Sequence, residues 1–108
     1  MAQNSVKPLM LSSILSSAVT AMYAPLNGTG FSQSPFFIRI INASSAAITV
    51  SYDGVNDHEF IAANSVFELP CQANSQPGAY MALFPKNTIV YLKGAAGTGN
   101  VYLSGYYV

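Results

Sequence analysis

Alternation of hydrophobic and polar residues is the main pattern in this chain, and it is clearest at 46–53. There Ile48, Val50 and Tyr52 alternate with Thr49 and Ser51. A period of two is typical of a β-strand with one buried face. The same pattern, with aromatic and β-branched enrichment, predicts strands at 19–24, 36–42, 46–53, 58–62, 65–69, 80–84, 88–93 and 100–108.

Turn residues separate these predicted strands. Asn27-Gly28-Thr29-Gly30 and Asp53-Gly54 are strong turn signals, 72–78 is a polar loop, and 94–99 is rich in glycine. Short strands with frequent turns predict an all-β fold, a seven- to eight-stranded antiparallel sandwich or a jelly-roll-like barrel. The glycine-rich loop lacks a P-loop lysine, so we expect a hairpin there rather than a phosphate site.

The first eighteen residues differ from the rest, and we interpret 1–18 as an extended N-terminal arm before a sandwich at 19–108. Residues 9–18 could instead form a short helix. The stretch from Lys7 to Ala21 imitates a signal peptide, but four serines interrupt its apolar run. We therefore expect no cleavage, folding in the cytoplasm, and an arm that lies on a neighbouring subunit. The stretch is also too short and polar to span a bilayer.

The composition of the chain is unusually poor in charged residues, which implies a surface with few charges. Hydrophobic residues make up 51% of the 108 residues, and charged residues only 7%, against about 25% in ordinary soluble domains. Four charges of each sign give zero net charge, which favours association; we expect a dimer or trimer. The alternative is a monomer coated with Ser, Thr, Asn and Gln. Four scattered cations cannot form a basic patch for nucleic acid.

Candidate catalytic and metal-binding residues are few. Asp53, Asp57, His58 and Glu59 fall within seven residues, but their spacing matches no EF-hand and no second His or Cys pair completes a zinc site. A turn stabilised by its own Asp side chain is the favoured interpretation. Cys71 is the only cysteine, so no intramolecular disulfide can form. We expect no catalytic site, no cofactor, no metal and no small-molecule substrate.

Aliphatic residues in the arm and tyrosines at the C-terminus are the candidate contact residues. In the last predicted strand, Tyr102 and Tyr106 face away from Val101 and Leu103. Exposed tyrosines suit a subunit contact, or stacking on a host glycan. The candidate interface comprises Leu9, Leu11, Ile14, Leu15, Tyr102, Tyr106 and Tyr107. Two glycosylation sequons, at Asn27 and Asn42, are interpreted as coincidence.

Residues 15–25 and 37–53 resemble small β-sandwich virion proteins of tailed bacteriophages. In those proteins a segment ending in Tyr-x-Ala-Pro precedes a strand, followed by Asn-x-Ser/Thr and a Val/Thr-rich strand. Here Tyr23-Ala24-Pro25 lacks the intervening residue, whereas Asn42-Ala43-Ser44 and 46–53 fit, and 90–107 is similar in character. The resemblance implies a virion protein that cements or decorates the capsid by contacting the major capsid protein. The alternative within that class is a neck, tail or fibre component.

Overall fold

The structure is a computed structural model that describes residues 6–70 and 84–107, and it is all-β. Two antiparallel sheets pack face to face as a sandwich and do not close into a barrel. The elements are β1 (Lys7–Pro8), β2 (Ser12–Leu15), the 3₁₀ turn η1 (Ser16–Ala18), β3 (Ala24–Pro25), β4 (Phe37–Ser44), β5 (Ile48–Ser51), β6 (Glu59–Ile61), β7 (Ser65–Pro70), β8 (Tyr91–Gly94) and β9 (Gly99–Tyr107).

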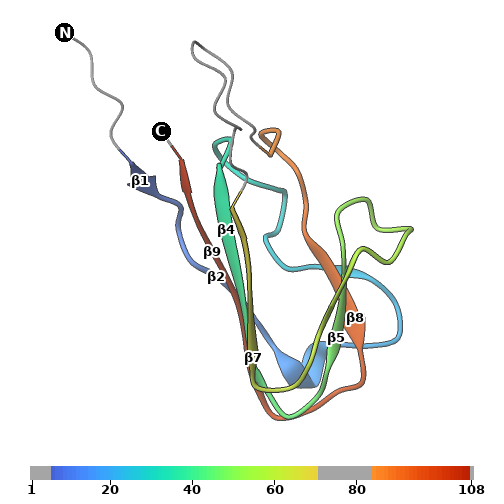
Figure 1. The fold of residues 1–108 in the computed structure, drawn as a ribbon. Coiled ribbons are helices and arrows are strands. Elements are labelled where there is room, and N and C mark those ends of the chain that lie inside the picture. Colours follow the sequence, from blue (N-terminus) through green and yellow to red (C-terminus); the bar gives the residue numbers. More distant parts are fainter. Residues whose placement is uncertain (1–5, 71–83, 108) are drawn as a thin grey trace, which may run out of the picture.

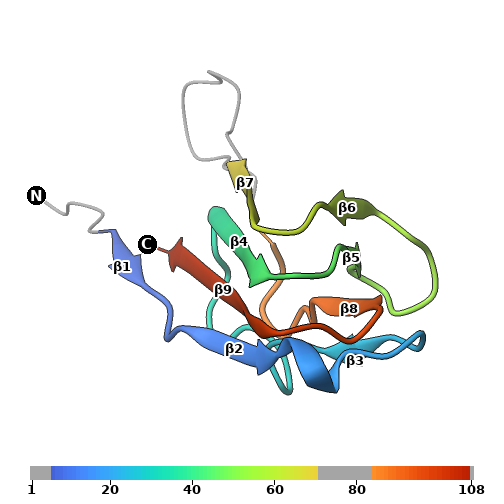
Figure 2. The ribbon, with the colours of Figure 1, turned by 90° about the horizontal axis from the view of Figure 1, so that it is seen from below.

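Within residues 6–70 and 84–107, sheet A has five strands and sheet B has four. Sheet A has the order β1-β9-β4-β7, with β2 also paired to β9, and sheet B has the order β3-β8-β5-β6. Seen from one end, the two sheets form separate layers (Figure 2). The connections β4–β5, β6–β7 and β8–β9 each pass from one sheet to the other, and they gather where the layers converge (Figure 1).

The core lies between the two inner faces and follows the alternation of the sequence. In β4 the buried residues are Ile38, Ile40, Asn42 and Ser44, which alternate with more accessible ones. Every second residue of a strand points to the same face, so one hydrophobic set supplies the core. The buried apolar side chains are Val19, Leu26, Phe31, Ile38, Ile40, Ile48, Val50, Ile61, Val90, Leu92, Val101 and Leu103.

A buried polar side chain joins the layers at their convergent end. Asn42 is fully buried, and its Nδ2 donates to the carbonyl oxygens of Ala46 at 3.0 Å, Ile61 at 3.3 Å and Ala62 at 3.0 Å. The hydroxyl of Ser44 donates to Asn42 Oδ1. A buried amide is tolerated only when its polar atoms are paired. Asn42 therefore fixes the β4–β5 turn against the end of β6, and it is not an accessible sequon.

Asn27, the other sequon, also has a structural role. Its Nδ2 donates to the Thr88 carbonyl at 3.2 Å, and its Oδ1 accepts the Val90 N–H at 3.0 Å. In the same turn Gly30 has a φ of 114°, and a Cβ there would lie 2.4 Å from the Asn87 carbonyl oxygen. Only glycine fits so close an approach with positive φ. The predicted 27–30 turn thus holds two distant loops together.

The N-terminal segment is extended, as predicted, but it lies on its own chain. β1 pairs Lys7 with Tyr107, and β2 pairs Ser12 with Leu103 and Ile14 with Val101. We expected the segment to rest on a neighbouring subunit. Instead, β1 and β2 pair with the side of β9 that β4 does not occupy, within the same sheet. For 9–18 we expected either extended chain or a short helix. Each expectation is met in part, because the strand β2 is followed by the short 3₁₀ turn η1.

Several predicted strands shift or change partners. Of 19–24 only Ala24 is in a strand, β3, and the strand predicted at 88–93 begins at Tyr91. The 94–99 loop connects β8 of sheet B to β9 of sheet A, so the expected hairpin is wrong. The strand predicted at 80–84 falls largely outside the described residues, as does Cys71. The strands predicted around 36–42, 46–53, 58–62, 65–69 and 100–108 are confirmed as β4, β5, β6, β7 and β9.

Candidate functional site

The outer face of sheet A carries a band of large apolar and aromatic side chains. Register places Phe37 opposite Tyr106, and Ile41 opposite both Tyr102 and Val66. The Phe37 and Tyr106 ring centroids are 5.9 Å apart, a separation that is common for paired aromatic rings. Val66 remains 57% exposed. We call this surface the A face, defined by Leu15, Phe37, Ile41, Val66, Tyr102 and Tyr106.

Charge on the A face is small and internally paired. Arg39 and Glu68 lie opposite each other in β4 and β7, and their Nε and Oε2 atoms are 2.8 Å apart. The Arg39 guanidinium also lies 5.6 Å from the Phe37 ring centroid. Opposite charges on neighbouring strands stabilise each other, which reduces the desolvation cost that a single charge would carry in an apolar band. The A face therefore presents apolar surface around one neutralised pair.

The predicted interface residues separate into two groups. Leu9 and Ile14 pack against the core, so they stabilise the sandwich from within. Leu11 and Leu15 are 57% and 59% exposed. The tyrosines at 102, 106 and 107 are half-buried, and Tyr102 and Tyr106 face outward as the alternation of β9 predicted.

Sequence reasoning missed three members of the A face: Phe37, Ile41 and Val66. Their signal was present, because they occupy the more accessible alternate positions of β4 and β7. The same alternation that identified Tyr102 and Tyr106 could have identified them. Only register, however, shows that residues of three strands form one surface.

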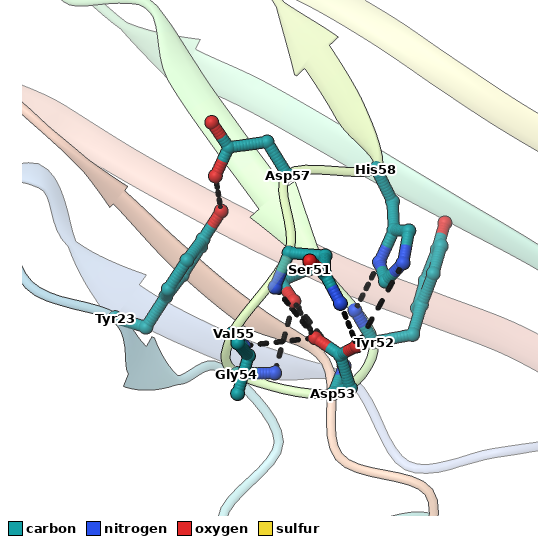
Figure 3. Close-up of polar contacts among 9 residues, drawn as sticks. Tyr23, Ser51, Tyr52, Asp53, Gly54, Val55, Asp57 and His58 are labelled. Carbon is teal, nitrogen blue, oxygen red and sulfur yellow. Dashed lines mark hydrogen bonds and ion pairs between the residues drawn. The ribbon is translucent and has the colours of Figure 1, made fainter.

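The residues of the predicted acidic cluster belong to two separate groups, a turn around Asp53 and a second group that contains Asp57. Asp53 Oδ1 accepts the N–H groups of Val55 and Asn56 at 2.8 and 2.9 Å, and the Ser51 hydroxyl at 2.8 Å (Figure 3). These hydrogen bonds hold the pKa of the Asp53 carboxyl far below its usual range, and the bond from the Asn56 N–H has the largest effect. An aspartate that hydrogen-bonds the following backbone is a common turn device. The turn interpretation is therefore confirmed for Asp53.

His58 is fixed to the same loop. Its Nδ1 accepts the Tyr52 N–H at 3.0 Å, and its Nε2 lies 4.0 Å from Asp53 Oδ2. The imidazole stacks on the Tyr52 ring with centroids 5.4 Å apart. A general base needs a nitrogen directed at the proton it removes. Both nitrogens of His58 are directed at groups of its own loop instead, as Figure 3 shows.

Asp57 belongs to a different group of side chains. Its Oδ1 accepts a hydrogen bond from the Tyr23 hydroxyl and lies 3.0 Å from Lys93 Nζ. Lys93 Nζ is also 4.6 Å from the Tyr23 ring centroid. The pKa of Asp57 is lowered most by the hydrogen bond from Tyr23 and next by the Lys93 ammonium. In return, the Asp57 carboxylate raises the pKa of Lys93. These three residues come from three separate segments and form a compact, neutral group on the outside of sheet B.

No cluster of three or more His, Cys, Asp or Glu side chains that could hold a metal ion occurs in residues 6–70 and 84–107. Across those same residues, no helix is long and apolar enough to cross a membrane. No protein-family model, curated protein or solved structure matches the chain. The fold defines a β-sandwich module, and its function has to be argued from its own surfaces.

Proposed function

We propose that this chain is a non-enzymatic structural subunit of a virus particle, and that it binds neighbouring subunits through the A face. One observation carries the proposal: two outward tyrosines, Phe37, Ile41 and Val66 form one apolar surface whose only central charges are paired with each other. Within the virion class, a capsid cement or decoration protein is the role we propose. The resemblance of the sequence to phage virion proteins supports that class.

The energetics of burial favour such a contact. Burying apolar surface contributes about 25 cal/mol per Å² before association costs are subtracted. A standard interface buries about 800 Å² on each partner, which is about an eighth of this chain's 6370 Å². Aromatic rings such as Tyr102 and Tyr106 are the side chains most often found at the centre of such contacts.

One edge of each sheet is less suited to association than the faces. β1, at one edge of sheet A, consists of Lys7 and Pro8, and β3, at one edge of sheet B, ends in Pro25. Proline lacks an N–H, and an edge lysine discourages the approach of another strand. Strand addition is therefore disfavoured at these edges, and face-to-face packing is the better mode of contact.

The first test is whether the chain belongs to assembled particles. We expect it to co-purify through density-gradient centrifugation with particles of the virus that encodes it. Ile41→Glu should sharply reduce the amount retained, because it places an unpaired carboxylate in the apolar band. Val55→Glu is the matched control, since Val55 is 77% exposed in the Asp53 loop and away from the A face. Absence of the wild-type chain from purified particles would contradict the proposal.

Copy number separates the two virion roles. A cement or decoration protein should be present in proportion to the major capsid protein, because it occupies repeated joints of the lattice. A neck, tail or fibre component should be far less abundant. Quantitative mass spectrometry of the same purified particles measures this ratio directly. A copy number far below that of the major capsid protein would instead indicate a neck, tail or fibre component.

A further inference from the structure

The outer face of sheet B, opposite the A face, carries a row of side chains whose chemistry changes across the sheet. Register places Phe60 beside Thr49, and Thr49 beside Lys93. The Tyr23 ring lies next to Lys93. Phe60 is 70% exposed, so an apolar ring stands at one end of a polar row. We call Tyr23, Thr49, Asp57, Phe60 and Lys93 the B row.

Phe60 and the polar groups share an open depression. Thr49, Asp57, His58, Glu59 and Phe60 line a hollow of about 320 Å³. That volume is at the lower end of what small-ligand sites enclose, about 300 Å³ and upward. Strand alternation places Glu59, opposite the buried Val50, on the other side of β6 from Phe60. The groups that can act together are therefore the Phe60 ring, the Thr49 hydroxyl and the Asp57 carboxylate.

Asp57 is held in place before any ligand arrives. The Tyr23 hydroxyl and the Lys93 ammonium both bind Oδ1. Figure 3 shows the second carboxylate oxygen directed away from Tyr23. Within the described residues, no hydrogen bond or ion pair involves that second oxygen. A fixed acceptor loses little conformational freedom when it binds a hydroxyl.

The charge of the B row selects the kind of ligand. Asp57 and Lys93 neutralise each other, so the B row carries no net charge of its own, and the Glu59 side chain belongs to the other side of β6. A wholly apolar partner would desolvate the Asp57 and Lys93 groups without pairing them, which is costly. The remaining class of ligand is uncharged and has both an apolar face that can pack on Phe60 and hydroxyls that can bind Asp57 and Thr49. A neutral sugar ring has this combination of a C–H face and a hydroxyl edge.

We propose that the B row is a binding site for a neutral saccharide. The sugar ring stacks on Phe60, one of its hydroxyls donates to Asp57, and the Thr49 hydroxyl provides a further contact. This site is independent of the proposed assembly function. Because it lies on the sheet opposite the A face, the module could be anchored by one face and bind sugar with the other.

The test is a titration of the full-length chain, followed by ¹H–¹⁵N NMR. The probes are the methyl glycosides of glucose, galactose, mannose and N-acetylglucosamine, and a glycan array covers larger oligosaccharides. We expect amide shifts centred on Thr49, Asp57 and Phe60 for at least one probe. Phe60→Ala should weaken that affinity at least about tenfold, and Phe60→Tyr should retain it. Val66→Ala, which also removes exposed apolar surface but on sheet A, should leave it unchanged.

Three outcomes would overturn the proposal. The first is that no glycoside shifts any B-row amide and no glycan on the array is bound. The second is that the shifts centre on Tyr102 and Tyr106, which would place sugar binding on the A face. The third is that a lysine-rich peptide shifts the B row while the glycosides do not. Thermal unfolding of Phe60→Ala verifies that lost binding is not lost folding; an exposed ring should change stability by no more than about 0.5 kcal/mol.

Discussion

At the scale of single residues, the polar side chains of this protein mostly maintain its backbone. Asn42 binds three carbonyl groups at the convergent end of the sandwich, Asn27 binds the distant segment at 88–90, and Asp53 organises its own turn. Each looked like a site for chemistry in the sequence, as a sequon or a metal ligand. Their hydrogen bonds instead replace those that the loops lose when they leave water.

Asn42→Ala should be among the most destabilising polar substitutions in the chain. It leaves the buried carbonyl of Ile61 and the part-buried carbonyls of Ala46 and Ala62 without their amide donor, and we expect a loss of about 3 kcal/mol in the free energy of unfolding. Urea denaturation measures it. Asn56→Ala is the matched control, because that amide contacts only the exposed Asp53 carboxylate through its side chain. Equal losses for the two variants would show that Asn42 does not join the layers.

At the scale of elements, the N-terminal segment is part of sheet A. β1 and β2 both pair with β9, and the N–H of Leu9 between them donates to the Gly105 carbonyl at 2.8 Å. Leu9 and Ile14 then cover one end of the core. A segment with so few residues in strands is stable only through such pairing and packing. Its stabilising effect is intramolecular, in contrast to a free arm that joins two subunits.

Ile14 and Leu15 offer a neighbouring pair that tests this role. Ile14→Ala removes apolar volume packed on the core, and we expect it to cost about 2 kcal/mol in unfolding free energy. Leu15→Ala changes an exposed side chain and should cost no more than about 0.5 kcal/mol. Denaturation of the dilute chain compares them. If Leu15→Ala proved the costlier change, β2 would not be docked on β9 in the register described.

At the scale of the whole molecule, low charge determines how it can associate. Four positive and four negative residues give no net charge, and the central pair on the A face is already neutralised. No long-range field steers or repels a partner, so contact depends on burial of apolar surface. Such attraction acts only at short range and is scarcely affected by dissolved ions.

Self-association through the A face should therefore be nearly independent of salt. We expect the dissociation constant of the dimer or trimer, measured by sedimentation equilibrium, to change less than about threefold between ~0.1 M and ~1 M sodium chloride, although the Debye length falls from ~10 to ~3 Å. Ile41→Glu should abolish the association and Val55→Glu should not. A steep loss with salt would indicate that ion pairs, rather than the apolar band, hold the subunits together.

The all-β class and much of the residue pattern within it follow from local sequence alone. Alternation is local, so β4, β5, β7 and β9 and the outward direction of Tyr102 could be predicted from neighbouring residues. The Asp53 turn is also local, because its donors lie within three residues of it in the chain. The candidate tyrosines were thus predicted, but the surface they belong to was not.

The tertiary structure decided which segments meet. Tyr23, Asp57 and Lys93 lie far apart in the chain and become neighbours only because β3, β8 and β5 share one sheet. Register likewise places Ile41 between Tyr102 and Val66. Strand pairing uses backbone groups that every residue carries, so local sequence cannot specify the partner. For the same reason, the pattern of the N-terminal segment predicted extended structure, while β9 decided that it lies on its own sheet.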